Sequence, residues 1–411
     1  MLVICHYGEI ALKGGNRKFF EEKLVENIKK SLKANGIVFN YVRRISGRIL
    51  VGIQKGDKQK VKNSLEKVFG ITYFVFTQQS NQDIESIKNK AIEILKSENF
   101  NSFKVQTKRG NKSFTLTSQQ VSEQVGEAVL GESGIRNQEL GIRNQELGIR
   151  NQELGIKNQE LGIRVDLHNP DVILYIEITE KFAFLYVKKF AGPGGLPLGV
   201  SSRAISLISG GIDSPVASYL MMKRGVENIF VHFYSTQQGY EQSLEKVRDI
   251  LRVLKKYQFS IKVYFVPFSD VQKEIVLKTK ADFRVVLYRR IMFLVANEIS
   301  VKEKAKALIT GESVGQVASQ TLENMLVVEE AVALPVLRPL AGLDKQEIMD
   351  LAKKIETYEI SILPHLDCCS MFAPEHPSTK ASLKDIKTQE KKLKLKKLIN
   401  QAIKNTIVEN L

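Results

Sequence analysis

A glycine-rich stretch near the middle of the chain carries the residues best suited to chemistry. The apolar run Ala204–Ile208 leads into Ser-Gly-Gly-Ile-Asp-Ser at residues 209–214, and Pro215 follows at once. Pro favours the first turn of a helix and Ser214 is a suitable N-cap, so we expect a strand, a tight turn and a helix that ends at Gly225. Backbone N–H groups of such a turn, at the start of a helix, bind anions. The stretch therefore predicts a phosphate site.

The pattern of this turn narrows the class of phosphate site. The Walker pattern G-x-x-x-x-G-K-[ST] is absent, and no G-x-G-x-x-G follows a predicted strand, so neither a P-loop NTPase nor a dinucleotide fold is supported. Ser-Gly-Gly-x-Asp-Ser resembles the PP-loop of ATP pyrophosphatases, which cleave ATP between its α- and β-phosphates. The alternative is an ordinary strand–helix turn that happens to be rich in glycine.

The cysteines form the second chemical feature. The chain contains Cys5, Cys368 and Cys369. An odd number without an export signal argues against a disulfide framework, and Cys5 falls in an apolar strand, where we expect it in the core. For the adjacent pair, a zinc site with His365 and His376 and simple burial of two thiols are alternatives. Sulfur transfer fits better, because a persulfide can deliver its terminal sulfur and a second thiol can resolve the resulting linkage.

Charge and composition indicate the kind of partner and the compartment. The 411 residues carry a formal net charge of +16, which suits a polyanion such as nucleic acid, although a lysine-rich enzyme would also show it. The sequence contains no run of about 18 apolar residues, so no membrane span is predicted. The first residues are typical of a strand rather than a signal peptide, so a cytoplasmic location is expected.

The first part of the chain predicts the element order β-α-β-β-α-β, which is that of a ferredoxin-like unit. The expected elements are a strand at Leu2–His6, a helix at Asn16–Ala34, strands at Val38–Arg43 and Ile49–Ile53, a helix at Lys58–Phe69 and a strand at Ile71–Thr77.

The middle of the chain predicts a second α/β region with a basic loop. Helices are expected at Ile84–Ser97 and Ser118–Leu130, a strand at Ser102–Thr107 and a hairpin at Val172–Thr179 and Phe182–Lys188. Between the strand that ends at Thr107 and the helix that begins at Ser118 lies the sequence Lys-Arg-Gly-Asn-Lys at residues 108–112, flanked by aromatic residues. This mixture suits RNA phosphates and unstacked bases, and a solvated loop is the alternative.

A seven-residue repeat interrupts this region. Gly-Ile-Arg-Asn-Gln-Glu-Leu recurs from Gly134 to Leu161, and a partial copy follows to Arg164. The Ile and Leu spacing does not match a coiled coil, and each copy carries a Gly that costs a helix about 1 kcal/mol. We expect an insertion tolerated in a surface loop, because extra loop length costs little closure entropy.

Beyond the Gly/Pro-rich linker Phe190–Pro197, strands and helices alternate. This pattern predicts an α/β, doubly wound parallel sheet. Its expected elements are Ala204–Ile208, Val216–Arg224, Asn228–Phe233, Gln242–Tyr257, Ile261–Pro267, Asp282–Val301 and Ala307–Thr310. The lysine-rich tail Ser382–Leu411 predicts an amphipathic surface helix, with RNA contact as a further hypothesis.

Five motifs occur in order along most of the chain: Gly8–Arg17, Phe103–Arg109, Ser209–Pro215, Thr310–Thr321 and Asp367–Cys369. With them the chain resembles the tRNA 4-thiouridine synthetases, or tRNA sulfurtransferases. The resemblance implies a ferredoxin-like part at 1–57, a THUMP-like RNA-binding domain at 58–190 with the insertion at 134–164, and a PP-loop catalytic domain at 191–411. The sequence departs from the family in that insertion, and nothing after residue 411 forms the rhodanese domain of some members.

The resemblance also implies the reaction and its participants. ATP and Mg²⁺ would serve to adenylate uridine O4 of tRNA at position 8, and sulfur from a cysteine desulfurase would replace that oxygen. Sulfur transfer to the thiamine-pathway sulfur-carrier protein is a second activity of some members. The alternatives are a PP-loop enzyme that acts on a small molecule and an RNA-binding protein with an inactive catalytic domain. The oligomeric state stays open, a homodimer included.

Family residues carry over to matching positions. Asp213 and Cys369 would be catalytic, with Cys368 as the second thiol. The predicted ATP contacts are Leu207, Ile208, Ser209, Gly210, Gly211, Ser214, His232, Phe233, Arg289, Gly311 and Gln320. The predicted RNA contacts are Lys104, Lys108, Arg109 and Lys112. Outside the resemblance, the residues themselves favour a place in the strand core for His232 and Phe233, and a surface ion pair for Arg289.

Overall fold

The computed structural model describes residues 1–131, 163–235, 240–364 and 374–411. Most of the heptad insertion, His365, Cys368 and Cys369 therefore lie outside the described residues. The chain divides into two compact units. Unit 1 comprises residues 1–7, 35–66 and 71–192, and unit 2 comprises residues 8–34, 67–70 and 193–411.

The predicted β-α-β-β-α-β order is confirmed at the start of the chain. The elements are β1 (Leu2–His6), α1 (Arg17–Ala34), β2 (Val38–Ile45), β3 (Arg48–Lys55), α2 (Lys58–Leu65) and β4 (Tyr73–Ser80). The strands pair antiparallel in the order β2-β3-β1-β4, which is the ferredoxin-like arrangement. Helix α2 ends four residues before the predicted end.

The same sheet continues through β4 into the second half of unit 1. It adds β8 (Ala183–Tyr186), β7 (Val172–Ile178), β5 (Ser102–Arg109) and the short β6 (Arg164–Val165), while β9 (Phe190–Ala191) pairs with β4. Helix α3 (Ile84–Lys96) and the helix at 118–131 contribute to a shared core with these strands, in which Phe103, Leu174 and Val121 are fully buried. Arg164, the last residue of the predicted insertion, thus begins a strand of the sheet.

Unit 2 contains a six-stranded sheet in the order β14-β13-β10-β11-β12-β15. Its parallel strands are β10 (Arg203–Leu207), β11 (Glu227–Tyr234), β12 (Lys262–Pro267), β13 (Leu308–Ile309) and β14 (Val336–Leu337). The chain passes from β10 outward to β12 on one side and to β13 and β14 on the other. The strand order therefore reverses between β10 and β13, which is where ligands bind in sheets of this kind.

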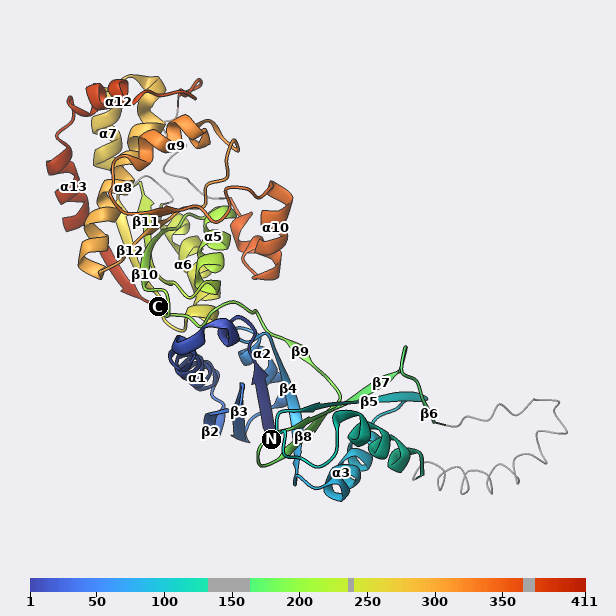
Figure 1. The fold of residues 1–411 in the computed structure, drawn as a ribbon. Helices are drawn as coiled ribbons and strands as arrows, with labels where there is room; N and C mark the ends of the chain where they lie inside the picture. Colours follow the sequence, from blue (N-terminus) through green and yellow to red (C-terminus); the bar gives the residue numbers. More distant parts are fainter. Residues whose placement is uncertain (132–162, 236–239, 365–373) are drawn as a thin grey trace, which may run out of the picture. The chain divides into compact units, whose positions relative to one another are not determined.

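Alternating side chains of these strands enter two separate cores, as a doubly wound sheet requires. Ile205 and Val231 pack with α7 (Ser269–Lys278), α8 (Arg284–Glu303), α9 (Leu322–Glu329) and α13 (Leu395–Lys404). Phe230 and Val263 pack with α5 (Asp213–Lys223), α6 (Tyr240–Gln258) and α10 (Lys345–Lys354). Figure 1 shows these two helix layers on opposite sides of β10, β11 and β12. The predicted fold class is confirmed.

The tail differs from the single surface helix that we expected. It forms α12 (Leu383–Glu390), α13 and the strand β15 (Ile407–Asn410). Residues 407–410 become a strand because they pair antiparallel with β12 along the edge of the sheet. Over the described ranges, no helix has the length and apolar character needed to cross a bilayer.

Candidate active site

A cavity of about 410 Å³ lies at the carboxyl ends of β10, β11 and β13 in unit 2. This volume is in the range of small-molecule sites. All the predicted ATP contacts except Gly210 line it: Leu207, Ile208, Ser209, Gly211, Ser214, His232, Phe233, Arg289, Gly311 and Gln320. Asp213 lines it too. The fold thus gathers residues from four separate stretches of sequence at one point.

The turn between β10 and α5 is closed by its own serines. The Ser209 N–H donates to Ser214 Oγ at 2.8 Å, and the Gly211 N–H donates to Ser209 Oγ at 3.3 Å. Helix α5 begins at Asp213 with Ile212 as its N-cap, so the prediction of Ser214 as the N-cap was wrong. Its hydroxyl instead reaches back across the turn, and Pro215 still lies in the first turn, where its missing N–H is not needed.

Gly311 lets the end of β13 approach the start of α5. A Cβ at this position would lie 2.7 Å from the Ser214 backbone nitrogen and 2.9 Å from the Asp213 carbonyl carbon. Real Cβ atoms do not come this close to backbone, so only glycine fits without a shift. Gly311 was predicted as an ATP contact, and the structure shows that it also serves backbone packing.

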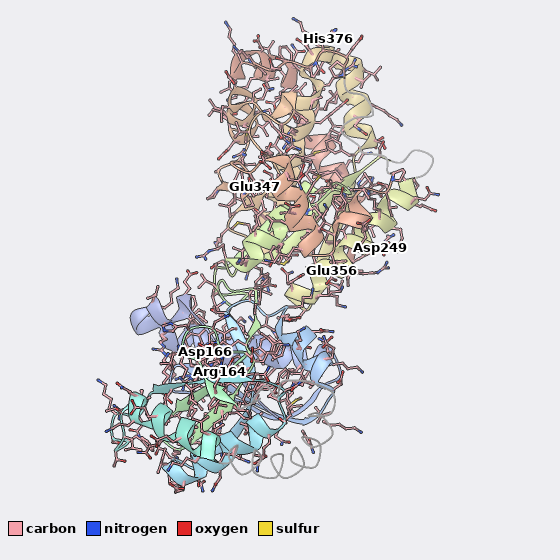
Figure 2. The ribbon with its side chains drawn as sticks, turned by 90° about the vertical axis from the view of Figure 1, so that its right-hand side faces the viewer. Arg164, Asp166, Asp249, Glu347, Glu356 and His376 are labelled. Carbon is pink, nitrogen blue, oxygen red and sulfur yellow. The ribbon has the colours of Figure 1, made fainter. Side chains whose placement is uncertain are left out.

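The Asp213 carboxylate is held by two residues far away in the sequence. Lys345 Nζ donates to Oδ1 at 2.6 Å, and Gln316 Nε2 donates to Oδ2 at 3.1 Å. Lys345 is the first residue of α10, whose start is fixed by a capping box between Asp344 and Glu347. Glu347 is labelled in Figure 2. Sequence reasoning missed Lys345, because one lysine among many carries no local signal.

A buried carboxylate organises two arginines beside the cavity. Glu312 is 1 % exposed and accepts hydrogen bonds from Thr310 Oγ1 at 2.8 Å, from Arg338 Nε at 2.7 Å and from Arg289 Nη2. Burial would raise the pKa of Glu312, but the charges of Arg289 and Arg338 outweigh it and hold the pKa below its ordinary value. Arg289 is thus an ion-pair partner that also lines the cavity. Sequence reasoning also missed Glu312 and Arg338.

Three further lining residues have structural contacts of their own. His232 is buried with Nδ1 2.8 Å from the Ile208 carbonyl oxygen. Phe233 packs edge-on against Phe268, with ring centroids 5.3 Å apart. The Gln320 carbonyl accepts the Gly315 N–H at 2.9 Å, which closes the loop after β13. The strand-core alternative for His232 and Phe233 therefore holds alongside their position in the cavity wall.

The predicted RNA contacts all belong to unit 1 and fall into two kinds. Arg109 Nη1 donates to the carbonyls of Phe114 and Leu116 at 2.8 and 2.7 Å, and Lys104 Nζ donates to the Leu167 carbonyl at 2.9 Å. Lys108 and Lys112 are exposed. The first two side chains hold the fold of unit 1 together, and the other two face solvent.

Comparisons with known proteins cover the whole chain. Residues 199–395 match the family described as thiamine biosynthesis protein (ThiI), residues 2–75 match the ThiI ferredoxin-like domain, and residues 81–149 match the THUMP domain. Proteins named probable tRNA sulfurtransferase are similar: that of Caldanaerobacter subterraneus subsp. tengcongensis is 44% identical over 97% of both chains. That of Moorella thermoacetica is 40% identical over 98% of this chain and 96% of its own.

Two solved structures are similar in fold. The crystal structure of a 4-thiouridine synthetase–RNA complex with bound ATP superposes with a TM-score of 0.84, at 34% identity, over 100% of this chain and 99% of that one. PH1313 from Pyrococcus horikoshii Ot3 superposes with a TM-score of 0.64, at 25% identity, over 86% of this chain and 99% of that one.

Proposed function

The chain belongs to the ThiI family of tRNA sulfurtransferases, and from this premise we propose that it uses ATP to replace O4 of a tRNA uridine with sulfur, giving 4-thiouridine. The observation that carries the proposal is the cavity of unit 2, where the Ser-Gly-Gly-Ile-Asp-Ser turn meets the Asp213–Lys345 ion pair. The similar synthetase was solved with both ATP and RNA bound, which supports the same two substrates here.

The residues of the cavity fit a nucleoside triphosphate. Leu207, Met292 and Phe293 give one part of its wall an apolar surface for a base. The turn after β10 and the first turn of α5 provide N–H donors for phosphate oxygens. Arg289 adds positive charge to the lining, and Lys345 adds positive charge beside it through its pair with Asp213. A Mg²⁺ ion would be held by Asp213 together with phosphate oxygens, and would neutralise charge on the phosphates.

The chemistry requires positioning more than acid–base catalysis. A uracil C4 oxygen is a poor leaving group. When this oxygen attacks the α-phosphate of ATP, pyrophosphate is released and the oxygen becomes part of an AMP leaving group. Sulfur then adds at C4 and AMP departs. The turn and Arg289 would hold the phosphates in line and balance their growing charge. Glu312 would position Arg289 for this task.

We assign delivery of sulfur to Cys369. The terminal sulfur of a Cys369 persulfide would add to C4, and the Cys368 thiol would attack the inner sulfur, leaving a Cys368–Cys369 disulfide and the thiolated base. A cysteine desulfurase would supply the persulfide sulfur. The description of the matching family as a thiamine biosynthesis protein favours a second activity, sulfur transfer to the thiamine-pathway sulfur-carrier protein.

One assay tests the proposal and separates its steps. The protein is incubated with unmodified tRNA, ATP, Mg²⁺ and a cysteine desulfurase with cysteine, and 4-thiouridine and pyrophosphate are measured. We expect both products, and we expect Cys369→Ser to release pyrophosphate in the first turnover without forming 4-thiouridine. Pyrophosphate release that needs no tRNA would favour a small-molecule substrate. Binding of tRNA without pyrophosphate release would favour an inactive RNA-binding protein.

A further inference from the structure

Five lysines gather on unit 2 between the end of α12 and the first turn of α13. They are Lys391, Lys392, Lys394, Lys396 and Lys397, which we call the lysine surface. All five are exposed, and the seven residues from 391 to 397 contain no acidic side chain. The remaining two residues of this stretch are leucines.

The leucines fix this stretch to the body of unit 2. Leu393 and Leu398 are buried in the core that contains α8, and Leu395 packs against the same core. Helix α8 also links the stretch to the cavity. Arg289 of α8 lines the cavity, while the next residue, Arg290, pairs with Glu390 at the end of α12 at 2.7 Å. The stretch that carries the lysines is therefore packed against and paired with α8, the helix that contributes Arg289 to the cavity.

Within the described part of the chain, the acidic neighbours of the lysine surface form their ion pairs with other cations, and Glu274 also interacts with Lys394. Glu390 pairs with Arg290, Glu330 pairs with Arg290 and Lys387, and Glu274 pairs with Lys278. Helix α13 has no side-chain cap and no acidic residue in its first turn. Positive charge is unfavourable at this end of a helix. In the isolated protein, the five closely spaced charges therefore repel one another near the unfavourable end of the helix dipole, and Glu274 offsets part of this at Lys394.

We propose that the lysine surface binds the phosphate backbone of the tRNA substrate, as an RNA contact of the catalytic unit in addition to the predicted contacts of unit 1. This inference rests on the proposed function for the identity of its ligand. A phosphate backbone supplies closely spaced negative charges, and binding releases their counterions to solvent. Such contacts hold the RNA in register without reading its sequence. They would hold the tRNA body while its uridine is at the cavity.

Two charge-matched variants of the full chain test the proposal. Lys391→Gln, Lys396→Gln and Lys397→Gln together remove three charges from the lysine surface. Lys255→Gln, Lys302→Gln and Lys306→Gln together remove three charges from exposed positions elsewhere on unit 2. The affinity for tRNA is measured at several salt concentrations for both, with thiolation kinetics and the melting temperature.

We expect only the lysine-surface variant to lower the slope of log affinity against log salt, by about two to three, because each lost phosphate contact removes about 0.9. Its KM for tRNA should rise while kcat stays unchanged. Its melting temperature should stay equal or rise, whereas a structural role would lower it. Equal slopes for both variants would overturn the proposal. Binding to phosphatidylglycerol vesicles is measured in parallel, and a lysine-surface variant that loses this binding but keeps its tRNA affinity would also overturn it. If the wild type binds tRNA but does not thiolate it, the proposed function fails while the affinity comparison still tests the surface.

Discussion

The glycine-rich turn of unit 2 and the basic loop of unit 1 were both predicted as binding elements, yet their side chains are arranged differently in the structure. At the turn, nearly every predicted residue lines one cavity, and the serines, Gly311 and Asp213 hold one another in place. Of the four cations predicted to contact RNA at this loop and in the strand before it, two bind backbone carbonyls and two face solvent. A turn motif depends on backbone geometry, which specifies where each residue lies. Positive charge alone does not distinguish a ligand contact from a structural one.

The largest effect should come from Asp213. Asp213→Asn keeps the shape of the side chain but removes the charge that Lys345 pairs with and that would hold Mg²⁺. We expect thiolation to fall by about 10²- to 10³-fold in single-turnover assays, as for loss of one electrostatic group in an active site. The affinity for tRNA should not change. Asp350→Asn on the exposed side of α10 is the control. An equal loss of thiolation in both variants would show that the turn carries no specific role for Asp213, and the contrast with the loop would not hold.

Glu312→Gln should give the next largest effect, on stability. It leaves Arg289 and Arg338 without their buried counter-charge, which should cost about 3 kcal/mol of unfolding free energy. Because the pKa of Glu312 is lower in the folded chain than in the unfolded chain, its contribution is present above the unfolded-state pKa and is lost as the pH falls through the folded-state pKa. Denaturant titrations of wild type and variant between neutral and acidic pH check this. A difference that stays constant with pH would contradict it.

Gly311→Ala tests the backbone packing behind the turn. The added Cβ would clash with the backbone of Asp213 and Ser214, so we expect a loss of about 1 to 3 kcal/mol and a weaker affinity for ATP. Gly342→Ala is the matched control, because a Cβ there meets no atom within 4 Å. Thermal unfolding and ATP titration measure the two effects. Wild-type behaviour of Gly311→Ala would show that the turn does not depend on this contact.

The smallest effects should separate the two kinds of cation in unit 1. Arg109→Gln removes hydrogen bonds to two loop carbonyls and should lower stability by about 1.5 kcal/mol. Lys108→Gln with Lys112→Gln should leave stability unchanged and should reduce the salt slope of tRNA binding by about two. Melting curves and tRNA titrations distinguish them. Lower stability in the lysine variant would show that Lys108 and Lys112 also have a structural role, as Arg109 does.

Much of the fold followed from local pattern, whereas the partners of the site residues did not. Alternating apolar strands and the glycine-rich turn predicted the parallel sheet and the place of the cavity, because both are encoded within a few residues. Lys345 and Gln316 could not be assigned, because they meet Asp213 across 132 and 103 residues. Ser214 was misread as an N-cap, because its hydroxyl bonds to Ser209 across the turn. The strand at the end of the tail forms only through pairing with β12.

The pairing of β15 with β12 has a consequence for handling the protein. β12 is rich in aromatic and β-branched residues, and without its antiparallel neighbour its backbone N–H and C=O groups would lie open along one side. Such an edge recruits strands from other molecules. Deleting residues 407–411, or fusing a tag that displaces them, should therefore promote aggregation before it affects catalysis.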